Sequence, residues 1–227
     1  HDAWDIDISY RDQLRETARL ISVETIGQGP AYGAVAFRFE IGASVIDQEV
    51  RLGAGSRRLD FVTRVNWAES RKMLRVAFPV DISSQEATYE IQYGTYKRPT
   101  HSNTSWDMAK FEVCGHRFAD LSEPGYGVAL LNDCKYGYRV QDNVLDLNLL
   151  RAPFFPDRTA DRGEHIFTYS LYPHPGTFEE SDVQAQAHVL NQPPLAMQGD
   201  VELPLPAMPA GDRILLEALK RAEAGDG

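Results

Sequence analysis

Apolar and polar residues alternate along several stretches in the first half of the chain. Nearly every second residue is apolar from Val35 to Ile41, from Leu59 to Trp67 and from Leu74 to Val80, with polar residues between them. Successive side chains of a β-strand point to opposite faces of a sheet, so this period of two predicts half-buried strands. Short stretches rich in Gly, Ser and Glu separate the runs, which predicts an antiparallel meander.

The second half of the chain continues this pattern in shorter runs, each bounded by Gly, Pro, Asn or Asp. The predicted strands are Phe111–Phe118, Tyr126–Leu131, Val144–Leu150 and Glu164–Tyr172. Helical periodicity is scarce. The pattern as a whole predicts an all-β fold.

Two predicted loops are too long for simple hairpin turns, Lys97–Asp107 and Arg151–Gly163. We expect a β-domain over residues 1–190, followed by an extended linker over 191–212, where prolines and alanines accumulate. The terminal segment, 213–227, has a pattern that suits a helix. A strand is the alternative, because the segment ends in a turn-like Gly-Asp-Gly, as in a hairpin whose second arm lies beyond the chain.

Composition narrows the class of protein. A chain of 227 residues can bury a full core as one domain, and its 43% hydrophobic and 25% charged residues are near globular averages. No apolar run is long enough to span a membrane. A net charge of -10, with basic residues scattered among acidic ones, argues against a nucleic-acid partner. Cys114 and Cys134 are too few for a disulfide framework and are expected to be reduced thiols.

Metal and nucleophile signatures give no candidate site. His1 and Asp2 stand close to Asp5 and Asp7, but alternate acidic residues in the strand-like segment Trp4–Ile8 are typical of a solvated strand face. The remaining histidines lack the spacing of HExxH or HxH, and no GxSxG elbow or Gly-rich phosphate loop occurs. We therefore predict no metal ligand and no catalytic residue in this chain.

Glycoside hydrolysis requires two carboxylates on either side of the bond that is cleaved. Several acidic residues near predicted strand ends or loops could qualify, and none is distinguished from a solvated turn carboxylate. These residues are Glu112, Asp120, Glu123, Asp133, Asp157 and Asp161.

One loop has a composition suited to a sugar. It contains Arg98, His101, Asn103, Trp106 and Asp107. Polar side chains of these types can match sugar hydroxyls, and an indole face can stack on the apolar face of a pyranose ring. We predict these five residues as a carbohydrate-binding set. The alternative is an ordered turn in which Trp106 fills a gap in the core.

From this loop onward, the amino-acid sequence resembles the C-terminal region of family 38 α-mannosidases, and it is most similar to the cytosolic branch. The similar segments are Arg98–Asp107, Phe111–Val113, His116–Glu123, Leu130–Gly137, Leu149–Pro153, Pro156–Asp157, Ala160–Asp161 and His165–Leu171. Trp4–Asp7 resembles the start of that region, so the likeness covers nearly the whole chain and is weakest over 191–211.

The resemblance implies a galactose-mutarotase-like antiparallel supersandwich, and it favours a strand over a helix at 213–223. It also implies a cytoplasmic parent enzyme acting on α-mannosides, whose N-terminal catalytic domain carries zinc, the nucleophile and the acid/base. Those zinc motifs have no counterpart here, so no cofactor is expected in this chain and its expected role is structural and substrate-shaping. A free-standing carbohydrate-binding module and an aldose-epimerase-like enzyme are the alternative functions.

Overall fold

The computed structural model describes residues 3–7, 9–13, 16–194, 196, 198–199, 220 and 222–225. The chain divides into two compact units, residues 1–193 and 194–227, and the elements below belong to the first. Most of the predicted linker at 191–212 and of the predicted terminal strand at 213–227 lies outside the described residues. Within the described part of the chain, no helix has the length and apolar character needed to cross a membrane.

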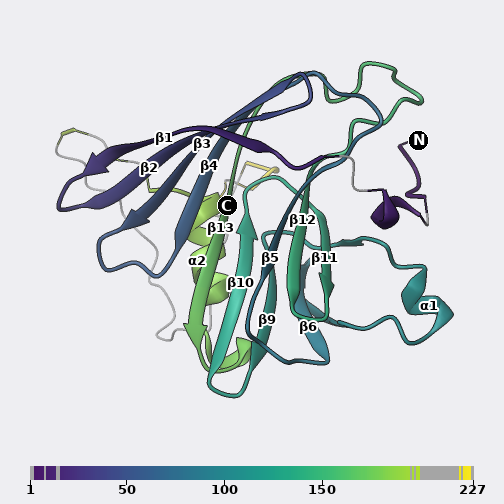
Figure 1. The fold of residues 1–227 in the computed structure, drawn as a ribbon. Coiled ribbons are helices and arrows are strands. Elements are labelled where there is room, and N and C mark those ends of the chain that lie inside the picture. Colours follow the sequence, from purple (N-terminus) through teal and green to yellow (C-terminus); the bar gives the residue numbers. More distant parts are fainter. Residues whose placement is uncertain are drawn as a thin grey trace. The chain divides into compact units, whose positions relative to one another are not determined.

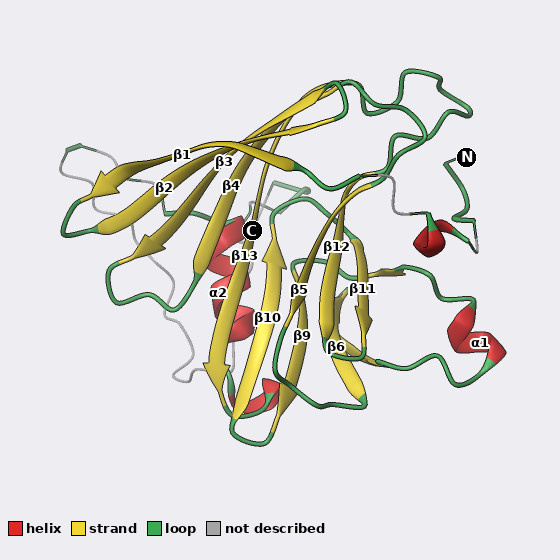
Figure 2. Ribbon diagram, in the orientation of Figure 1, coloured by secondary structure: helices red, strands yellow, loops and turns green. Residues whose placement is uncertain are grey.

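Nine of the described strands form one antiparallel sheet (Figures 1 and 2). Their order across the sheet is β1-β2-β3-β4-β13-β10-β9-β6-β7. The strands are β1 (Arg19–Gln28), β2 (Tyr32–Ile41), β3 (Ser44–Gly53), β4 (Leu59–Trp67), β6 (Glu86–Ile91), β7 (Gly94–Pro99), β9 (Phe118–Glu123), β10 (Tyr126–Asn132) and β13 (Gly163–Pro175).

A second antiparallel sheet has four described strands in the order β5-β12-β11-β8. They are β5 (Leu74–Pro79), β8 (Val113–Cys114), β11 (Gly137–Gln141) and β12 (Val144–Leu150). The short helical elements are η1 (Tyr10–Asp12), α1 (Ser105–Met108), η2 (Phe178–Glu180) and α2 (Val183–Asn191).

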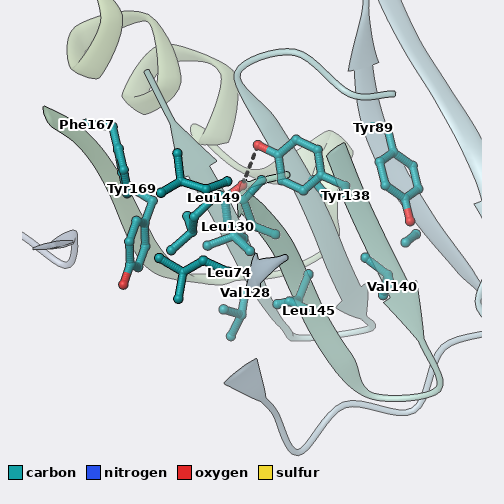
Figure 3. Close-up of a cluster of buried hydrophobic side chains, with 14 of the residues drawn as sticks. Leu74, Tyr89, Val128, Leu130, Tyr138, Val140, Leu145, Leu149, Phe167 and Tyr169 are labelled. Carbon is teal, nitrogen blue, oxygen red and sulfur yellow. Dashed lines mark hydrogen bonds between the residues drawn. The ribbon is translucent and has the colours of Figure 1, made fainter. Parts of the chain in front are cut away.

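The main core lies between the two sheets (Figure 3). Leu130 of β10 and Leu145 and Leu147 of β12 are fully buried in it, as is Val65 of β4. Each such side chain contributes about 1.5–3 kcal/mol by leaving water. The tyrosines Tyr89 and Tyr138 belong to the same core and also reach the candidate site described below.

Strand β10 is buried on both faces, which explains its unbroken apolar sequence. Val128 and Leu130 pack in the core between the sheets, whereas Ala129 and Leu131 pack in a second cluster with Val183 and Ala187 of α2. Because strand side chains alternate, the odd residues face the helix and the even ones face the second sheet. Helix α2 therefore closes the side of the large sheet that the second sheet leaves open.

The predicted fold class, an all-β antiparallel supersandwich, is confirmed. Strand Val144–Leu150 is confirmed with its predicted bounds. The strand predicted at Tyr126–Leu131 extends one residue further, to Asn132, and the strand predicted at Glu164–Tyr172 runs from Gly163 to Pro175. The strand predicted at Phe111–Phe118 is wrong over most of its length, because only Val113–Cys114 pairs. The chain leaves the small sheet there and enters the large sheet at Phe118.

Two other local predictions need correction. The described part of the strand-like segment Trp4–Ile8, Trp4–Asp7, forms no strand, and Ile8 lies outside the described residues. This segment lies instead against the loop after β12, where the rings of Trp4 and Phe155 are 5.6 Å apart. The predicted loop Lys97–Asp107 is interrupted at both ends, because β7 continues to Pro99 and α1 begins at Ser105.

Candidate functional site

A hollow opens between the loop after β7 and strand β11. It is lined by Tyr89, Arg98, Pro99, His101, Ser102, Asp107, Lys110, Val113, Tyr138, Arg139, Val140 and Gln141. Its cavity volume is about 30 Å³, whereas one water molecule needs roughly 10–15 Å³. The hollow therefore has room for a few oxygen atoms, from water or from sugar hydroxyls.

Arg98 forms one wall of the hollow. It stands on β7 opposite Ala87 of β6, and its guanidinium carbon lies 5.5 Å from the ring centre of Tyr89 and 5.0 Å from that of Tyr96. Its Nη2 donates to the carbonyl of Cys114 at 3.2 Å. The buried Nε has no hydrogen-bond partner. The two rings thus hold the guanidinium in place while leaving one donor available.

The loop that follows Arg98 is anchored at Thr100. The Thr100 hydroxyl donates to the Ser84 carbonyl at 2.7 Å, and the Thr100 carbonyl accepts from the side chain of Gln141 at 2.9 Å. The hydroxyl of Ser102 donates to Oε1 of the Gln141 side chain at 2.9 Å. Strand β11 therefore fixes both ends of the first turn of the loop, which positions His101 between them.

Helix α1 positions Asp107 at the far side of the hollow. Thr104 caps the helix by accepting from the Asp107 amide at 3.1 Å, and its hydroxyl donates to the Asp107 carboxylate at 2.7 Å. This hydroxyl, together with the charges of Lys110 and His101, lowers the pKa of Asp107. Lys110 Nζ lies 3.6 Å from the same carboxylate. Asp107 is therefore an ionised acceptor near neutral pH.

Unpartnered donors and cationic groups dominate the hollow. His101 Nδ1 lies 4.0 Å from Asp107 Oδ2, beyond hydrogen-bond distance, and has no other partner. Burial raises the pKa of Tyr89 to about 12, so its hydroxyl remains protonated. Three cationic side chains, Arg98, Lys110 and Arg139, line the hollow with a single carboxylate. Such a site favours an oxygen-rich ligand that accepts hydrogen bonds.

The structure places three of the five predicted sugar-binding residues in this hollow, namely Arg98, His101 and Asp107. Asn103 and Trp106 belong to the same loop and helix but are exposed outside the lining. Trp106 is 80% exposed, so it does not fill a core gap, which was the alternative interpretation of the loop.

Several lining residues could not be found from the sequence. Tyr89 comes from β6, whereas Tyr138, Arg139 and Gln141 come from β11. Tyr89 reaches the hollow because β6 forms a hairpin with β7, whereas the residues of β11 lie far from the loop along the chain and are brought to it by the long-range order of the strands. No local pattern indicates such a meeting.

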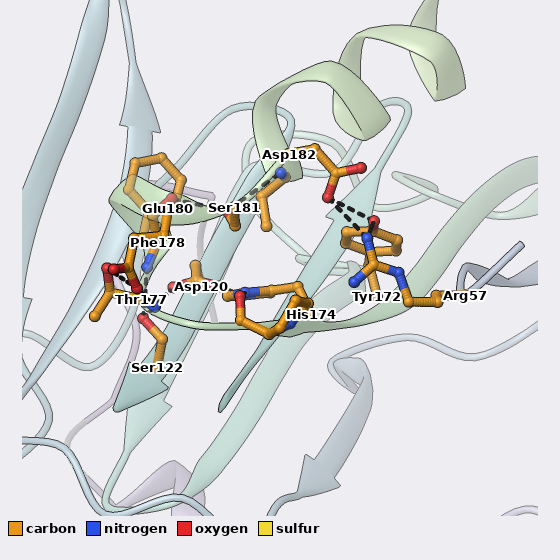
Figure 4. Close-up of polar contacts among 12 residues, drawn as sticks. Arg57, Asp120, Ser122, Tyr172, His174, Thr177, Phe178, Glu180, Ser181 and Asp182 are labelled. Atoms are coloured by element: carbon orange, nitrogen blue, oxygen red, sulfur yellow. Dashed lines mark hydrogen bonds and ion pairs between the residues drawn. The ribbon is translucent and has the colours of Figure 1, made fainter. Parts of the chain in front are cut away.

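A second polar cluster lies between the large sheet and the segment that leads into α2 (Figure 4). His174 Nε2 and Asp120 Oδ2 are 2.7 Å apart, and both side chains are fully buried. The hydroxyl of Ser122 donates to Asp120 at 2.8 Å and accepts from the amide of Phe178. The serine contacts the carboxylate rather than the imidazole, so this is not a nucleophile–base arrangement.

The candidate carboxylates are all occupied by local partners. Glu112 pairs with Arg75, Asp120 with His174, and Asp161 accepts from two backbone amides of 151 and 152. The others likewise accept backbone amides, Glu123 from Ser83, Asp133 from Thr168 and Asp157 from Thr159. Within the described ranges, no group of three or more His, Cys, Asp or Glu side chains could hold a metal ion.

Comparison with known proteins identifies relatives of this chain. The chain is 45% identical over 231 residues to human alpha-mannosidase 2C1, and 39% identical over 240 residues to alpha-mannosidase G of Dictyostelium discoideum. These alignments cover 98% and 99% of this chain and 22% of each relative. The chain therefore spans about a fifth of the length of the curated relatives it matches.

A solved α-mannosidase from Enterococcus faecalis V583 superposes with a TM-score of 0.67 at 17% identity, over 75% of this chain and 24% of that one. At this identity the likeness concerns the fold. Fold and sequence together define a β-domain of the kind found in α-mannosidases. The family model described as "Glycosyl hydrolases family 38 C-terminal domain" matches residues 1–159, and the chain belongs to this family.

Proposed function

We propose that this chain is the non-catalytic C-terminal part of a retaining α-mannosidase, and that its Arg98–Asp107 loop shapes the sugar-binding end of that enzyme. The observation that carries the proposal is the hollow beside this loop, where Arg98 Nε and His101 Nδ1 are buried without hydrogen-bond partners. A buried donor without a partner costs about 1–3 kcal/mol. A sugar hydroxyl in the hollow would accept from Arg98 Nε, and because a hydroxyl both donates and accepts, it would also pair with His101 Nδ1 in either tautomer.

The size and surroundings of the hollow support this arrangement. A cavity of about 30 Å³ has room for a few oxygen atoms, so hydroxyls of the sugar would enter it while the ring would lie across its mouth. The exposed indole of Trp106 and the amide of Asn103, on the same loop and helix, would then contact the ring from outside. On this proposal, all five predicted residues serve one ligand, three from within the hollow and two at its rim.

Hydrolysis itself belongs, on this proposal, to the part of the parent enzyme that this chain does not include. The candidate carboxylates of this domain are engaged by backbone amides or cations, whereas hydrolysis needs two carboxylates that act on one bond. Zinc, the nucleophile and the acid/base would reside in the N-terminal catalytic domain, and a cytoplasmic location remains a prediction. Accordingly, the pure 227-residue chain should release no aryl alcohol from an aryl α-mannoside, with or without added zinc.

The test is made in the full-length enzyme with Arg98→Ala and Trp106→Ala. Loss of a charged hydrogen bond costs about 1.5–3 kcal/mol, which corresponds to roughly 10- to 150-fold in kcat/KM, and loss of a stacked ring costs about 1 kcal/mol, or roughly fivefold. Arg64→Ala and Tyr93→Ala are matched controls, because Arg64 on β4 and Tyr93 in the turn between β6 and β7 are exposed and do not line the hollow. They should leave turnover unchanged.

Thermal midpoints of the same variants separate a contact with the sugar from support of the fold. If turnover falls only in proportion to the folded protein that is lost, the loop supports the domain and does not bind sugar. Measurable affinity of the separate chain for mannose, lost in Trp106→Ala, would instead favour a free-standing carbohydrate-binding module. The exposed Trp106 is the feature that keeps this second function open.

A further inference from the structure

Strands β1, β2 and β3 carry an apolar face that continues outward from the core. Leu20 of β1 pairs with Phe39 of β2, and Val23 pairs with Phe37, so these four side chains share one face of the sheet. Phe39 packs against the main core, and its ring stacks on that of Phe37 with 6.0 Å between centres. Leu20 and Val23, farther from the core, are 49% and 54% exposed.

Exposed apolar side chains are concentrated on these three strands. Leu20, Val23 and Leu52 are 45–54% exposed on the face of Phe37 and Phe39. Ile21 and Ile26 are the extra residues of the two bulges of β1, and Tyr32 lies on the other face, with Arg38. Strand β1 lies at the edge of the large sheet, has ten residues and is exposed at nearly every position. Contiguous apolar surface of this kind marks a site where another part of a protein packs.

The opposite face of the same strands is suited to water. Arg38 of β2 forms an ion pair with Asp47 of β3 at 3.2 Å, and Arg64 of β4 forms one with Glu164 at 2.8 Å, all with exposed side chains. These residues alternate with the apolar ones along their strands, so they point to the other side. A covering element is therefore needed on one face only.

The second sheet ends where this apolar face becomes exposed. Phe78 of its edge strand β5 packs on Phe61 of β4 and on Tyr169 of β13, with ring centres 5.5 and 6.2 Å apart. Strand β5 thus lies opposite β4 and β13, and among the described strands none continues the small sheet beyond it. Figure 1 shows β1–β3 at the left of the view, away from β5, β12 and β11.

We propose that strands of the same polypeptide from outside residues 1–227 extend the four-stranded sheet beyond β5 and cover the apolar face of β1–β3. The chain spans only 22% of the length of its curated relatives, so the polypeptide of such a protein has ample sequence to supply them. The covering strands carry apolar residues at every second position, facing Leu20, Val23 and Phe37. This inference needs the chain to be part of a longer protein, but not the sugar-binding role of the loop.

Cysteine labelling in the full-length protein tests the proposal. Val23 and Ile166 are 54% and 58% exposed in this chain, and Ile166 lies on the solvated face opposite Arg64. Without a covering element, Val23→Cys and Ile166→Cys should react with a thiol reagent at similar rates. With the proposed strands in place, Val23→Cys should react at least tenfold more slowly. Peptide mass spectrometry separates each site from the native thiols, and Leu20→Cys serves as a second variant.

The occupant is identified by a photo-crosslinking residue at position 20 of the full-length protein. A crosslink to a segment of the same polypeptide outside residues 1–227 supports the proposal. Equal labelling rates at Val23→Cys and Ile166→Cys would overturn it. So would a crosslink to residues 195–227 or to β1 of a second copy, since the cover would then be the chain's own terminus or a dimer. None of these readouts depends on mannoside turnover.

Discussion

The buried pair of His174 and Asp120 makes the stability of the domain depend on pH in a direction that can be inverted by one substitution. Burial alone lowers the pKa of His174, but the hydrogen bond and charge of Asp120, with the carbonyl of Pro175, raise it further than burial lowers it. The pKa of His174 in the folded chain is therefore above its ordinary value. Arg57 opposes this rise by its own charge.

A raised pKa of a histidine means that the folded state holds its proton more tightly than the unfolded chain. The resulting stabilisation is complete below about pH 6.5, the ordinary histidine value, and is lost as the pH rises through the folded pKa. In Asp120→Asn the imidazole stays buried without its carboxylate, so its pKa falls below the ordinary value. Stability should then be lost as the pH falls, which is the opposite trend.

The magnitude follows from the burial of both side chains, each 0% exposed. Removing one partner of a buried ion pair costs about 3–5 kcal/mol. For a domain of this size that corresponds to a fall in the thermal midpoint of roughly 6–20 °C at pH 6. The difference between Asp120→Asn and the unmodified chain should shrink as the pH rises and His174 loses its proton in the unmodified chain.

Urea unfolding at a series of pH values between 6 and 9 measures both quantities. The matched control is Glu164→Gln, which removes an ion pair of similar length, 2.8 Å, whose side chains are 56% and 57% exposed. It should cost less than about 1 kcal/mol and leave the pH profile parallel to that of the unmodified chain. If the Asp120→Asn profile is also parallel, the pair does not hold the proton and the reasoning is refuted.

Two further predictions concern close packing and thiol chemistry. In Gly127→Ala the new Cβ would lie 2.3 Å from a ring atom of the buried His174, so chemical unfolding should show a destabilisation of about 1–3 kcal/mol. The control is Gly94→Ala, whose new Cβ has no atom within 4 Å, and it should change the free energy of unfolding by less than about 1 kcal/mol. Burial, with the neighbouring Asp133, raises the pKa of Cys134 to about 11. At pH 8 it should therefore carry roughly a hundredfold less thiolate than an ordinary cysteine, and alkylation followed by mass spectrometry should show slow reaction that accelerates above pH 10. Equal stability of the two glycine variants, or rapid alkylation of Cys134 at pH 8, would contradict these expectations.

The strands that were predicted from the sequence are those with an uninterrupted local pattern. In Val144–Leu150, apolar Leu145, Leu147 and Leu149 alternate with polar Asp146 and Asn148, and the strand pairs with β5 and β11, with one register shift near its end. Strand β1 has a comparable apolar content but was not predicted, because bulges after Leu20 and Thr25 each insert an extra residue and disturb the period of two. The alternation of apolar and polar residues therefore predicts a strand best where few bulges interrupt its pairing with the neighbouring strands.

Helix α2 and the second wall of the hollow were missed for different reasons. Val183, Ala187 and Leu190 have helical spacing, but the Gln-rich surroundings give a weak apolar stripe that matters only once it packs on β9 and β10. The wall formed by Tyr138 and Gln141 depends on long-range strand order, which one sequence does not encode in any local signal. The loop side of the site is local in sequence and was therefore predictable.

The hollow beside Arg98 and the exposed apolar face of β1–β3 differ in chemistry, and this difference indicates what kind of partner each one would bind. The hollow beside Arg98 presents buried hydrogen-bond donors in a space of about 30 Å³, and such groups are satisfied by a few oxygen atoms, which a small polar ligand provides. The face of Leu20 and Val23 presents exposed hydrocarbon on long strands, so its stabilisation grows with the apolar area that is covered, which an element of protein structure provides. Covering that face would leave the hollow's lining unchanged, because none of the residues lining the hollow belongs to β1, β2 or β3. Substitutions at Leu20 should therefore change how the domain is held within the larger protein, whereas substitutions at Arg98 should change what it binds.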